Sequence, residues 1–219
     1  MIVSSPHLVS FNGAEYALGT VRGQEIHYSF GRIVAFLELK GKATFGSDFR
    51  IFTEDHEILK KLIYYQIRDE ENCKRHQLDP SKGILLTGPI GCGKTSLMKL
   101  LSTIVPHRKA YQVIPSRNIV FEFNKRGHEV ISDYGSASFF CFDDVGVEPM
   151  GQHFGQECNV LGEVLLSRYD YYVAHGVRTH ITTNLNAREL ESRYGNRVRS
   201  RMRRLFNLIS FDTNSKDKR

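Results

Sequence analysis

The stretch from Gly88 to Ser96 constrains the fold of this 219-residue chain more than any other, because it reads GPIGCGKTS. It matches the pattern G-x-x-x-x-G-K-[ST] at every fixed position. Glycines there let the backbone wrap closely around a phosphate group, and the helix that follows adds N–H groups and a positive dipole end. The apolar run GILLT precedes the loop, and leucines at helical spacing follow it. The segment therefore predicts a buried strand, a phosphate-binding loop and a helix.

The loop residues are all candidates for contact with a bound nucleotide. They are Gly88, Pro89, Ile90, Gly91, Cys92, Gly93, Lys94, Thr95 and Ser96. We expect Lys94 to reach the β- and γ-phosphate oxygens, and the Thr95 hydroxyl to bind Mg²⁺. ATP and Mg²⁺ are therefore the expected cofactors.

Two acids end the apolar run Ser138–Asp144, which reads SFFCFDD. Ligands of parallel α/β sheets bind at the carboxyl ends of the strands, and the metal beside a phosphate-binding loop needs a carboxylate. Asp143 is the candidate carboxylate on the metal side, acting through a water. Asp144 is the candidate that orients or deprotonates the attacking water, and Glu148 is the alternative for that second role.

The expected strand Thr179–Asn184, which reads THITTN, also ends in polar residues. If this strand lies between the strand before the loop and the strand of Asp143, Asn184 lies beside the γ-phosphate. Asn184 is then a candidate to hold the attacking water and to sense the γ-phosphate. The same residue type is also a common helix cap.

Strands and helices alternate along most of the chain. The expected strands are 83–87, 110–114, 138–144, 179–184 and 207–211, and the expected helices include 117–125, a long helix closed by Gly176, and 187–205. Upstream, Thr53 is expected to cap a helix beginning at Glu54, whereas Ser29–Gly41 fits either a helix or a strand. Continuously apolar strands alternating with helices predict an α/β fold with a parallel sheet covered on both faces.

The composition is compatible with several partners and excludes few. A net charge of +6 and a pI near 9.1 fit an anionic partner such as nucleic acid, and they fit a solvated surface equally well. The N-terminus has no signal-peptide pattern, and no apolar run reaches the ~18 residues of a membrane span. Four cysteines without a CxxC pair fit reduced thiols, so we expect a cytoplasmic protein.

Arginines crowd the expected helix 187–205. They are Arg188, Arg193, Arg197, Arg199, Arg201, Arg203 and Arg204. Helical spacing predicts that four of them, at positions 193, 197, 201 and 204, share one side. Such a stripe is typical of a solvated or nucleic-acid-facing surface, and a single arginine of this kind can instead reach the γ-phosphate of a neighbouring subunit.

Four segments together resemble the DnaC/IstB-like AAA+ ATPases, which include bacterial helicase loaders and transposition helper ATPases. The segments are GILLTGPIGCGKTSLMKLL, FFCFDDVGVEP, ITTNLNARELESRYGNRVRSRMR and NLISF. The Walker A loop and the Walker B acids are common to many NTPases. The ordered combination of DDVG, TTNLN, ELESRYG and RVRSRMR is much more specific, and the resemblance covers roughly residues 46–212.

The resemblance implies a P-loop NTPase of AAA+ type with a five-stranded sheet in the order 5-1-4-3-2. It implies ATP bound between subunits of a ring or spiral, and single-stranded DNA along the inner face of that spiral. The family's arginine finger falls in the segment RVRSRMR, which points to Arg201, with Arg197 second. Residues 46–219 are then the ATPase domain, and residues 1–45 are an N-terminal extension of uncertain structure that is a candidate partner-binding segment.

The chain departs from the AAA+ pattern in three respects. Many AAA+ proteins carry Glu where this chain has Asp144, and the shorter acid is expected to slow hydrolysis. No helical lid domain is expected after the fifth strand. The first 45 residues contain no cysteine, so they cannot form the zinc site of some loaders.

Three functions fit these features. The first is an ATPase that assembles on DNA and helps to place a replicative helicase. The second is an IstB-like ATPase that brings a transposase to target DNA. The third is a nucleotide-gated DNA-binding module with little turnover. The sequence does not separate the first two, and a measurement of turnover would distinguish the third. We also expect nucleotide-dependent self-association through the ATP site.

Overall fold

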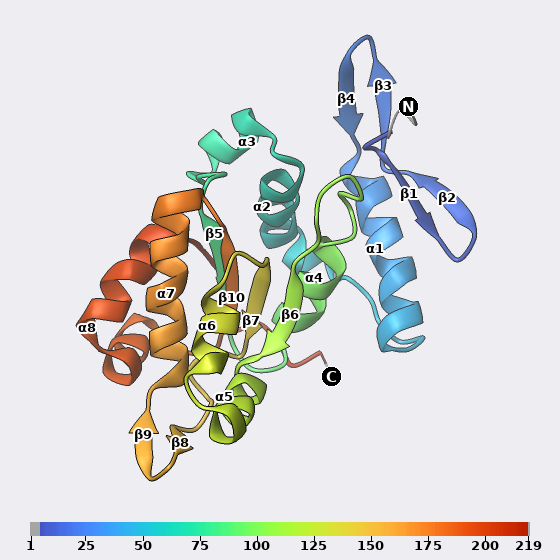
Figure 1. Ribbon diagram of the computed structural model, residues 1–219. Coiled ribbons are helices and arrows are strands. Elements are labelled where there is room, and N and C mark those ends of the chain that lie inside the picture. Colours follow the sequence, from blue (N-terminus) through green and yellow to red (C-terminus); the bar gives the residue numbers. More distant parts are fainter. Residues whose placement is uncertain (1–4, 219) are drawn as a thin grey trace. The chain divides into compact units, whose positions relative to one another are not determined.

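The computed structural model describes residues 5–218, which form two compact units (Figure 1). The first unit holds the described residues up to Leu78 together with Ser96–Ala110. The second holds Asp79–Thr95 and the described residues from Tyr111 onward. None of the helices in this range is both long and apolar enough to cross a membrane.

A five-stranded parallel sheet organises the second unit. Its strands are β5 (Gly83–Thr87), β6 (Gln112–Pro115), β7 (Phe140–Asp143), β10 (Thr179–Thr183) and β11 (Phe206–Ser210). The order along the sheet is β11-β5-β10-β7-β6, and every neighbouring pair is parallel. Counted along the chain this order is 5-1-4-3-2, as the resemblance implies. The carboxyl ends of β5 and β7 therefore flank that of β10, which is the placement needed for Asn184.

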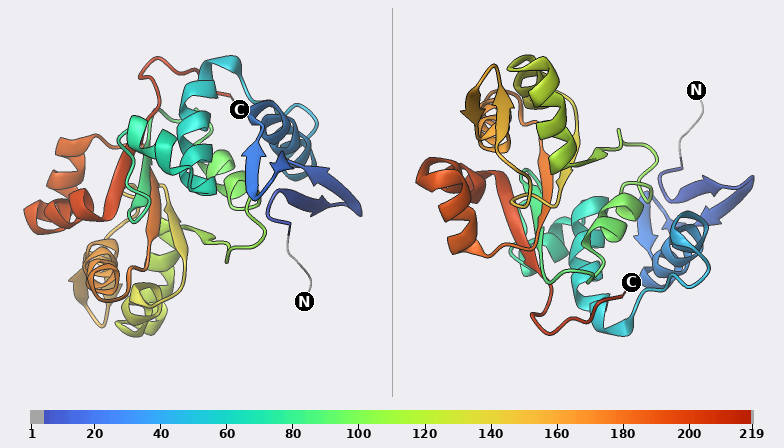
Figure 2. Two further views of the ribbon diagram at one scale, coloured as in Figure 1. Left: turned by 90° about the horizontal axis from the view of Figure 1, so that it is seen from above. Right: turned by 90° about the horizontal axis from the view of Figure 1, so that it is seen from below.

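Helices α5 (Ser116–Arg126), α6 (Glu129–Gly135), α7 (Val160–His175) and α8 (Ala187–Leu205) form one layer against this sheet (Figure 2). Every residue of the central strands β7 and β10 is buried, which explains their continuous apolar character. Phe142 and Ile181 contribute to the same core as Leu161 and Leu165 of α7. Coverage of the opposite face by helices stays a prediction.

Helix α8 consists of two segments that meet at Gly195, whose backbone (φ 81°, ψ 165°) is not helical. The expected single stripe of four arginines is therefore wrong. Arg193 precedes the kink, and its guanidinium donates to the backbone carbonyl of Glu148. Arg197, Arg201 and Arg204 follow the kink and retain helical spacing among themselves.

A short hairpin that the sequence did not predict lies between β7 and α7. It consists of β8 (Gly151–His153) and β9 (Gln156–Cys158), which pair antiparallel across a two-residue turn. Strands of this length give too few residues for a period-2 pattern to be recognised.

The first unit begins with two hairpins that the sequence also left unassigned. They are β1 (Leu8–Phe11) with β2 (Ala14–Ala17), and β3 (Gly19–Arg22) with β4 (Glu25–Tyr28). Helix α1 (Phe30–Phe45) follows, so the segment that fitted either a helix or a strand is a helix, capped by Ser29. Residue 45 is also where the extension was predicted to end, and that domain boundary stays a prediction.

Three helices complete the first unit: α2 (His56–Ile67), α3 (Glu70–Arg75) and most of α4 (Lys94–Leu101). The prediction that Thr53 caps a helix beginning at Glu54 is wrong. Thr53–Asp55 is a 3-10 turn, tightened by a bond from the Asp55 N–H to the Phe52 carbonyl, and α2 begins only at His56.

Candidate nucleotide-binding site

The loop between β5 and α4 has a backbone that requires glycine. Gly88, Gly91 and Gly93 have φ angles of 157°, 78° and 99°, which side chains rarely tolerate. A Cβ atom on Gly88 would also lie 2.6 Å from the Cβ atom of Phe211. The three glycines of the sequence motif therefore occupy positions whose backbone conformation favours glycine.

Lys94 lies inside this loop, with only 5% of its surface exposed. Its ammonium group donates to the carbonyls of Gly88 and Pro89, both at 2.8 Å. These contacts hold a positive charge among backbone groups at the start of a helix. An anionic group such as a phosphate fits this environment.

Thr95 and Asp143, the two residues predicted to lie at one metal, are in direct contact, and the metal itself stays a prediction. The Thr95 Oγ1 is 2.9 Å from Oδ1 and 3.0 Å from Oδ2 of Asp143. No group of three or more His, Cys, Asp or Glu side chains suited to a metal occurs among residues 5–218. Mg²⁺ typically takes one or two protein carboxylates, substrate phosphates and several waters, so one carboxylate and one hydroxyl fit it.

Thr182 joins the two acids, a role that the sequence did not reveal. Its hydroxyl donates to Asp143 Oδ1 at 2.6 Å and accepts from the backbone N–H of Asp144 at 2.9 Å. The Asp144 carbonyl accepts from the Ser116 hydroxyl at 2.8 Å. Asp144 has a φ of 54°, and unlike the buried Asp143 it is exposed. Hydrogen bonds of its backbone N–H and carbonyl thus hold Asp144 in a sparsely populated, positive-φ conformation just after the carboxyl end of β7.

The carboxylate of Glu148 is occupied by a buried cluster. One oxygen accepts from the Gly146 N–H at 2.8 Å and the other accepts from the Tyr194 hydroxyl, while Arg193 lies 3.7 Å away. Burial, reinforced by the Glu148 charge, raises the pKa of Tyr194, which remains a hydrogen-bond donor. The choice of Asp144 over Glu148 as the acid that activates water stays a prediction.

Asn184 follows β10 at the end of the sheet where Asp143 lies. Its side-chain Oδ1 is buried and has no hydrogen-bond partner among the described residues. Buried acceptors are normally satisfied by protein, water or ligand, because leaving one unpaired costs about 1–3 kcal/mol. An acceptor with these properties suits the predicted role of holding a water beside the γ-phosphate.

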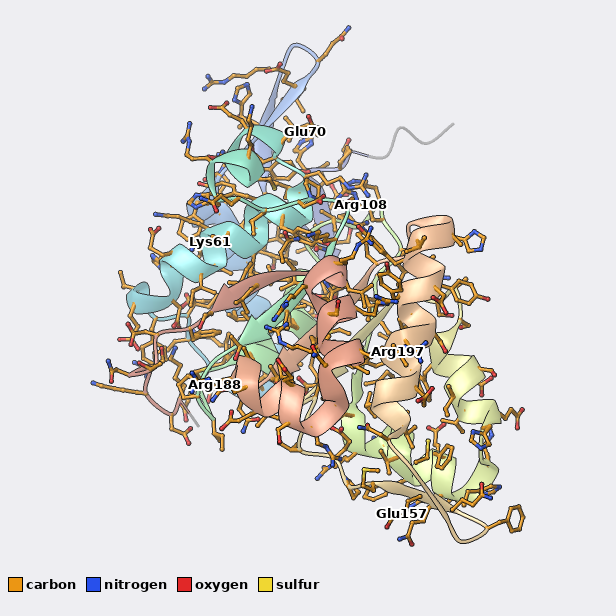
Figure 3. The ribbon with its side chains drawn as sticks, turned by 90° about the vertical axis from the view of Figure 1, so that its left-hand side faces the viewer. Lys61, Glu70, Arg108, Glu157, Arg188 and Arg197 are labelled. Carbon is orange, nitrogen blue, oxygen red and sulfur yellow. The ribbon has the colours of Figure 1, made fainter. Side chains whose placement is uncertain are left out.

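Arg201 and Arg197 occupy different environments on α8. The Arg201 guanidinium lies over the ring of Tyr169, 4.7 Å from its centroid, and Arg204 lies 5.8 Å from the same ring. Arg197 is exposed (Figure 3). An action of either residue on a second subunit stays a prediction.

The segment after β11 returns to the phosphate-binding loop, which the sequence gave no reason to expect. The Lys218 backbone N–H donates to the Gly91 carbonyl at 3.0 Å, and its ammonium donates to the Cys92 carbonyl at 3.4 Å. The Asp217 carboxylate lies beside Gly91. A Cβ atom added to Gly91 would lie 2.1 Å from Oδ1 of Asp217. Asp217 and Lys218 therefore lie against the loop at Gly91 and Cys92.

Comparison with curated proteins gives a local match. The proteasome-associated ATPase of Catenulispora acidiphila is 40% identical over 62 residues, and that of Streptomyces scabiei is 36% identical over 61 residues. Each alignment covers 28% of this chain and 10% of the relative, so the chain matches about a tenth of these proteins. No protein-family model matches the chain.

Comparison with solved structures gives longer matches. A structure described as a primosome component from Streptococcus pyogenes serotype M3 aligns with a TM-score of 0.55 and 19% identity, covering 78% of this chain and 86% of that one. The structure of DnaI aligns with a TM-score of 0.51 and 20% identity, covering 76% and 89%. The resemblance to DnaC/IstB-like AAA+ ATPases is therefore confirmed at the level of the fold.

Proposed function

We propose that this chain binds and hydrolyses ATP as an AAA+ protein acting on DNA in the cytoplasm, and that it helps to load a replicative helicase, as DnaC-like proteins do. The contact of Thr95 with Asp143, beside the buried Lys94, carries this proposal. The similarity in fold to a primosome component and to DnaI supports the replication context.

The binding step uses the loop from Gly88 to Ser96. Its N–H groups and the Lys94 ammonium hold the β- and γ-phosphates, which replaces the carbonyl contacts that Lys94 makes with the loop. Thr95 and Asp143 hold Mg²⁺, which would neutralise phosphate charge and orient the γ-phosphoryl group. Thr182 keeps the Asp143 carboxylate in position by its hydrogen bond.

The hydrolytic step uses Asp144 and Asn184. The Asp144 carboxylate orients the attacking water and accepts its proton, and the Asn184 Oδ1 accepts a hydrogen bond from the same water. Both groups follow neighbouring central strands, which supports their joint action on one molecule. Because Asp144 is shorter than glutamate, turnover is slow.

Assembly completes the site in this proposal. Arg201, or Arg197 in second place, reaches the γ-phosphate of a neighbouring subunit, so ATP favours a ring or spiral. Single-stranded DNA binds the remaining arginines of α8, and each subunit repeats the same contacts along the strand. Once one subunit of the assembly is bound, the others are held at a high effective concentration near the same DNA strand, so the assembly binds DNA more tightly than a monomer does.

Two measurements test this function. ATP turnover, with and without single-stranded DNA, should require Lys94, and fluorescence anisotropy should show ATP-promoted, salt-sensitive oligonucleotide binding with a slope of about −0.7 per neutralised phosphate. Negligible turnover alongside ATP-gated DNA binding would instead indicate the non-hydrolysing module.

Loading and transposition are separated by the partner. In a purified system, the chain should increase the amount of replicative helicase placed on a closed single-stranded circle. Stimulation of a transposase at target DNA, without an effect on helicase loading, would favour the IstB-like function instead.

A further inference from the structure

The segment that follows β11 reverses direction through a turn built around Asp212. The Phe211 N–H first continues the pairing with β5 by donating to the Thr87 carbonyl at 2.8 Å. The Asp212 carboxylate then accepts from the Asn214 N–H at 2.8 Å, and the Asp212 carbonyl accepts from the Ser215 N–H at 3.0 Å. Aspartate commonly stabilises a turn in this way. Local hydrogen bonds therefore bring the segment back to the phosphate-binding loop.

Lys218 and Asp217 meet the middle of that loop. The Lys218 N–H donates to the Gly91 carbonyl at 3.0 Å, and the Lys218 ammonium donates to the Cys92 carbonyl at 3.4 Å. The ammonium also lies over the Phe211 ring, 5.4 Å from its centroid. The Asp217 carboxylate lies so close to Gly91 that no side chain could separate the segment from the loop. One residue, Lys218, thus supplies a donor to two consecutive carbonyls of the loop.

These two hydrogen bonds orient the peptide units of the loop. No cis peptide bond occurs among residues 5–218, and in a trans peptide unit the carbonyl and the N–H point in opposite directions. The bond to the Cys92 carbonyl therefore directs the Gly93 N–H away from Lys218. The bond to the Gly91 carbonyl acts in the same way on the Cys92 N–H, which donates to the Pro89 carbonyl at 3.5 Å.

The loop benefits from such support because glycine has the greatest backbone freedom of all residues. Gly88, Gly91 and Gly93 all lie in this loop, and each loses conformational freedom when a bound phosphate fixes it. A loop that is already held in its binding conformation loses less freedom on binding, which raises the affinity for the ligand.

Net charge does not explain a contribution of this segment to phosphate binding. Residues 212–218 contain two acids, Asp212 and Asp217, and two lysines, Lys216 and Lys218. The two negative and two positive charges cancel. The direction of the Lys218 hydrogen bonds is therefore the feature that can act on the loop.

We propose that Lys218 is a positioning residue of the nucleotide site, which holds the Gly91 and Cys92 carbonyls so that the Gly93 N–H is already oriented for a phosphate before ATP binds. The inference rests on the proposed function and adds to it a residue from outside the loop. Bound phosphate itself orders the loop, so Lys218 acts on the affinity for nucleotide and not on the chemical step.

Titration calorimetry of the full chain with ATP and with ADP tests this role. Lys218→Met keeps the backbone N–H and a stem of similar length but lacks the ammonium, so both affinities should fall about two- to tenfold, as for one lost hydrogen bond. Lys216→Met removes the same charge from an exposed residue of the same segment and should bind as the wild type does. In Lys218→Met the KM for ATP should rise while kcat stays unchanged, because the lost interaction acts on binding alone.

Amide hydrogen exchange without nucleotide measures the loop directly. Peptides that cover residues 88–96 should exchange faster in Lys218→Met than in the wild type or in Lys216→Met. Unchanged exchange would overturn the proposal, as would an unchanged or higher ATP affinity in Lys218→Met, or a lower kcat with an unchanged KM. A wild type that binds no ATP would contradict the proposed function, whereas the exchange rates decide on their own whether Lys218 holds the loop.

Discussion

The Thr182 hydroxyl donates to Asp143 Oδ1 at 2.6 Å while it accepts from the Asp144 N–H at 2.9 Å. One side chain on β10 therefore holds both the carboxylate of Asp143, the last residue of β7, and the backbone of Asp144, which follows it. The candidate acid for the metal and the candidate acid for the water are thus both bonded to Thr182.

Replacing Thr182 with valine tests this coupling. Valine has nearly the same shape but no hydroxyl, so the buried Asp143 carboxylate loses the hydrogen bond that Thr182 donates to it. We expect this loss to lower the free energy of unfolding by about 1–3 kcal/mol. We expect weaker Mg²⁺ dependence of ATP turnover and a lower rate. Thr182→Ser, which keeps the hydroxyl, should stay close to the wild type, and equal losses in both variants would show that packing matters rather than hydrogen bonding.

Replacing Lys94 with alanine should reduce ATP affinity strongly. The variant loses two or more charge-assisted hydrogen bonds to phosphate, each worth about 1.5–3 kcal/mol. Isothermal titration calorimetry measures the loss, and Lys99→Ala, at an exposed lysine of α4, serves as the control. Unchanged ATP affinity in the Lys94 variant would contradict the assignment of the loop.

Asp144→Asn should bind ATP and lose turnover, because an amide cannot accept the proton of the attacking water. Glu148→Gln should mainly lower the free energy of unfolding, because it disturbs a buried cluster with Tyr194 and Arg193. Steady-state phosphate release and urea unfolding on both variants separate the roles. The opposite pattern, with normal turnover only in Asp144→Asn, would assign the water to Glu148.

Arg201 is expected to act on a neighbouring subunit, so the specific ATPase activity of the wild type should rise with protein concentration. Arg201→Ala and Lys94→Ala should each be inactive. An equimolar mixture should recover part of the activity, because it can form interfaces with one intact loop and one intact arginine. Turnover that does not change with concentration would argue for a site complete within one chain.

Stability should fall in mild acid because of His180. Burial, with smaller contributions from Arg178 and Arg168, lowers the pKa of His180 to about 3, from an ordinary value of 6.5. Below pH 6.5 the unfolded chain binds a proton that the folded chain refuses, so the free energy of unfolding decreases by about 1.4 kcal/mol per pH unit until the pH nears 3.

A matched variant isolates this contribution. The His180 Nδ1 accepts from the Ile84 N–H at 3.1 Å, and asparagine can also accept that bond without titrating. Urea unfolding at pH 7 and pH 5 should show the wild type losing about 2 kcal/mol more than His180→Asn between the two conditions. Equal losses would place the acid sensitivity elsewhere.

The sequence predicted those parts of the site that depend on local pattern. The loop, the two acids and Asn184 each follow a recognisable strand, and the alternation of strands with helices placed them at one edge of a parallel sheet. Thr182, Tyr194 and Lys218 were missed because their contacts join residues 39 or more positions apart, which no local periodicity encodes. The arginine stripe was wrong because a glycine that helical spacing tolerates adopts a non-helical conformation.

That glycine has a mechanical consequence. Before Gly195, Arg193 and Tyr194 attach the first segment of α8 to Glu148, in the loop that follows the Asp143–Asp144 pair. After it, the helix leads directly into the edge strand β11. Gly195 thus joins a segment tied to the acidic loop to a segment that is packed in the core through Val198 and Met202, and this second segment carries Arg197 and Arg201.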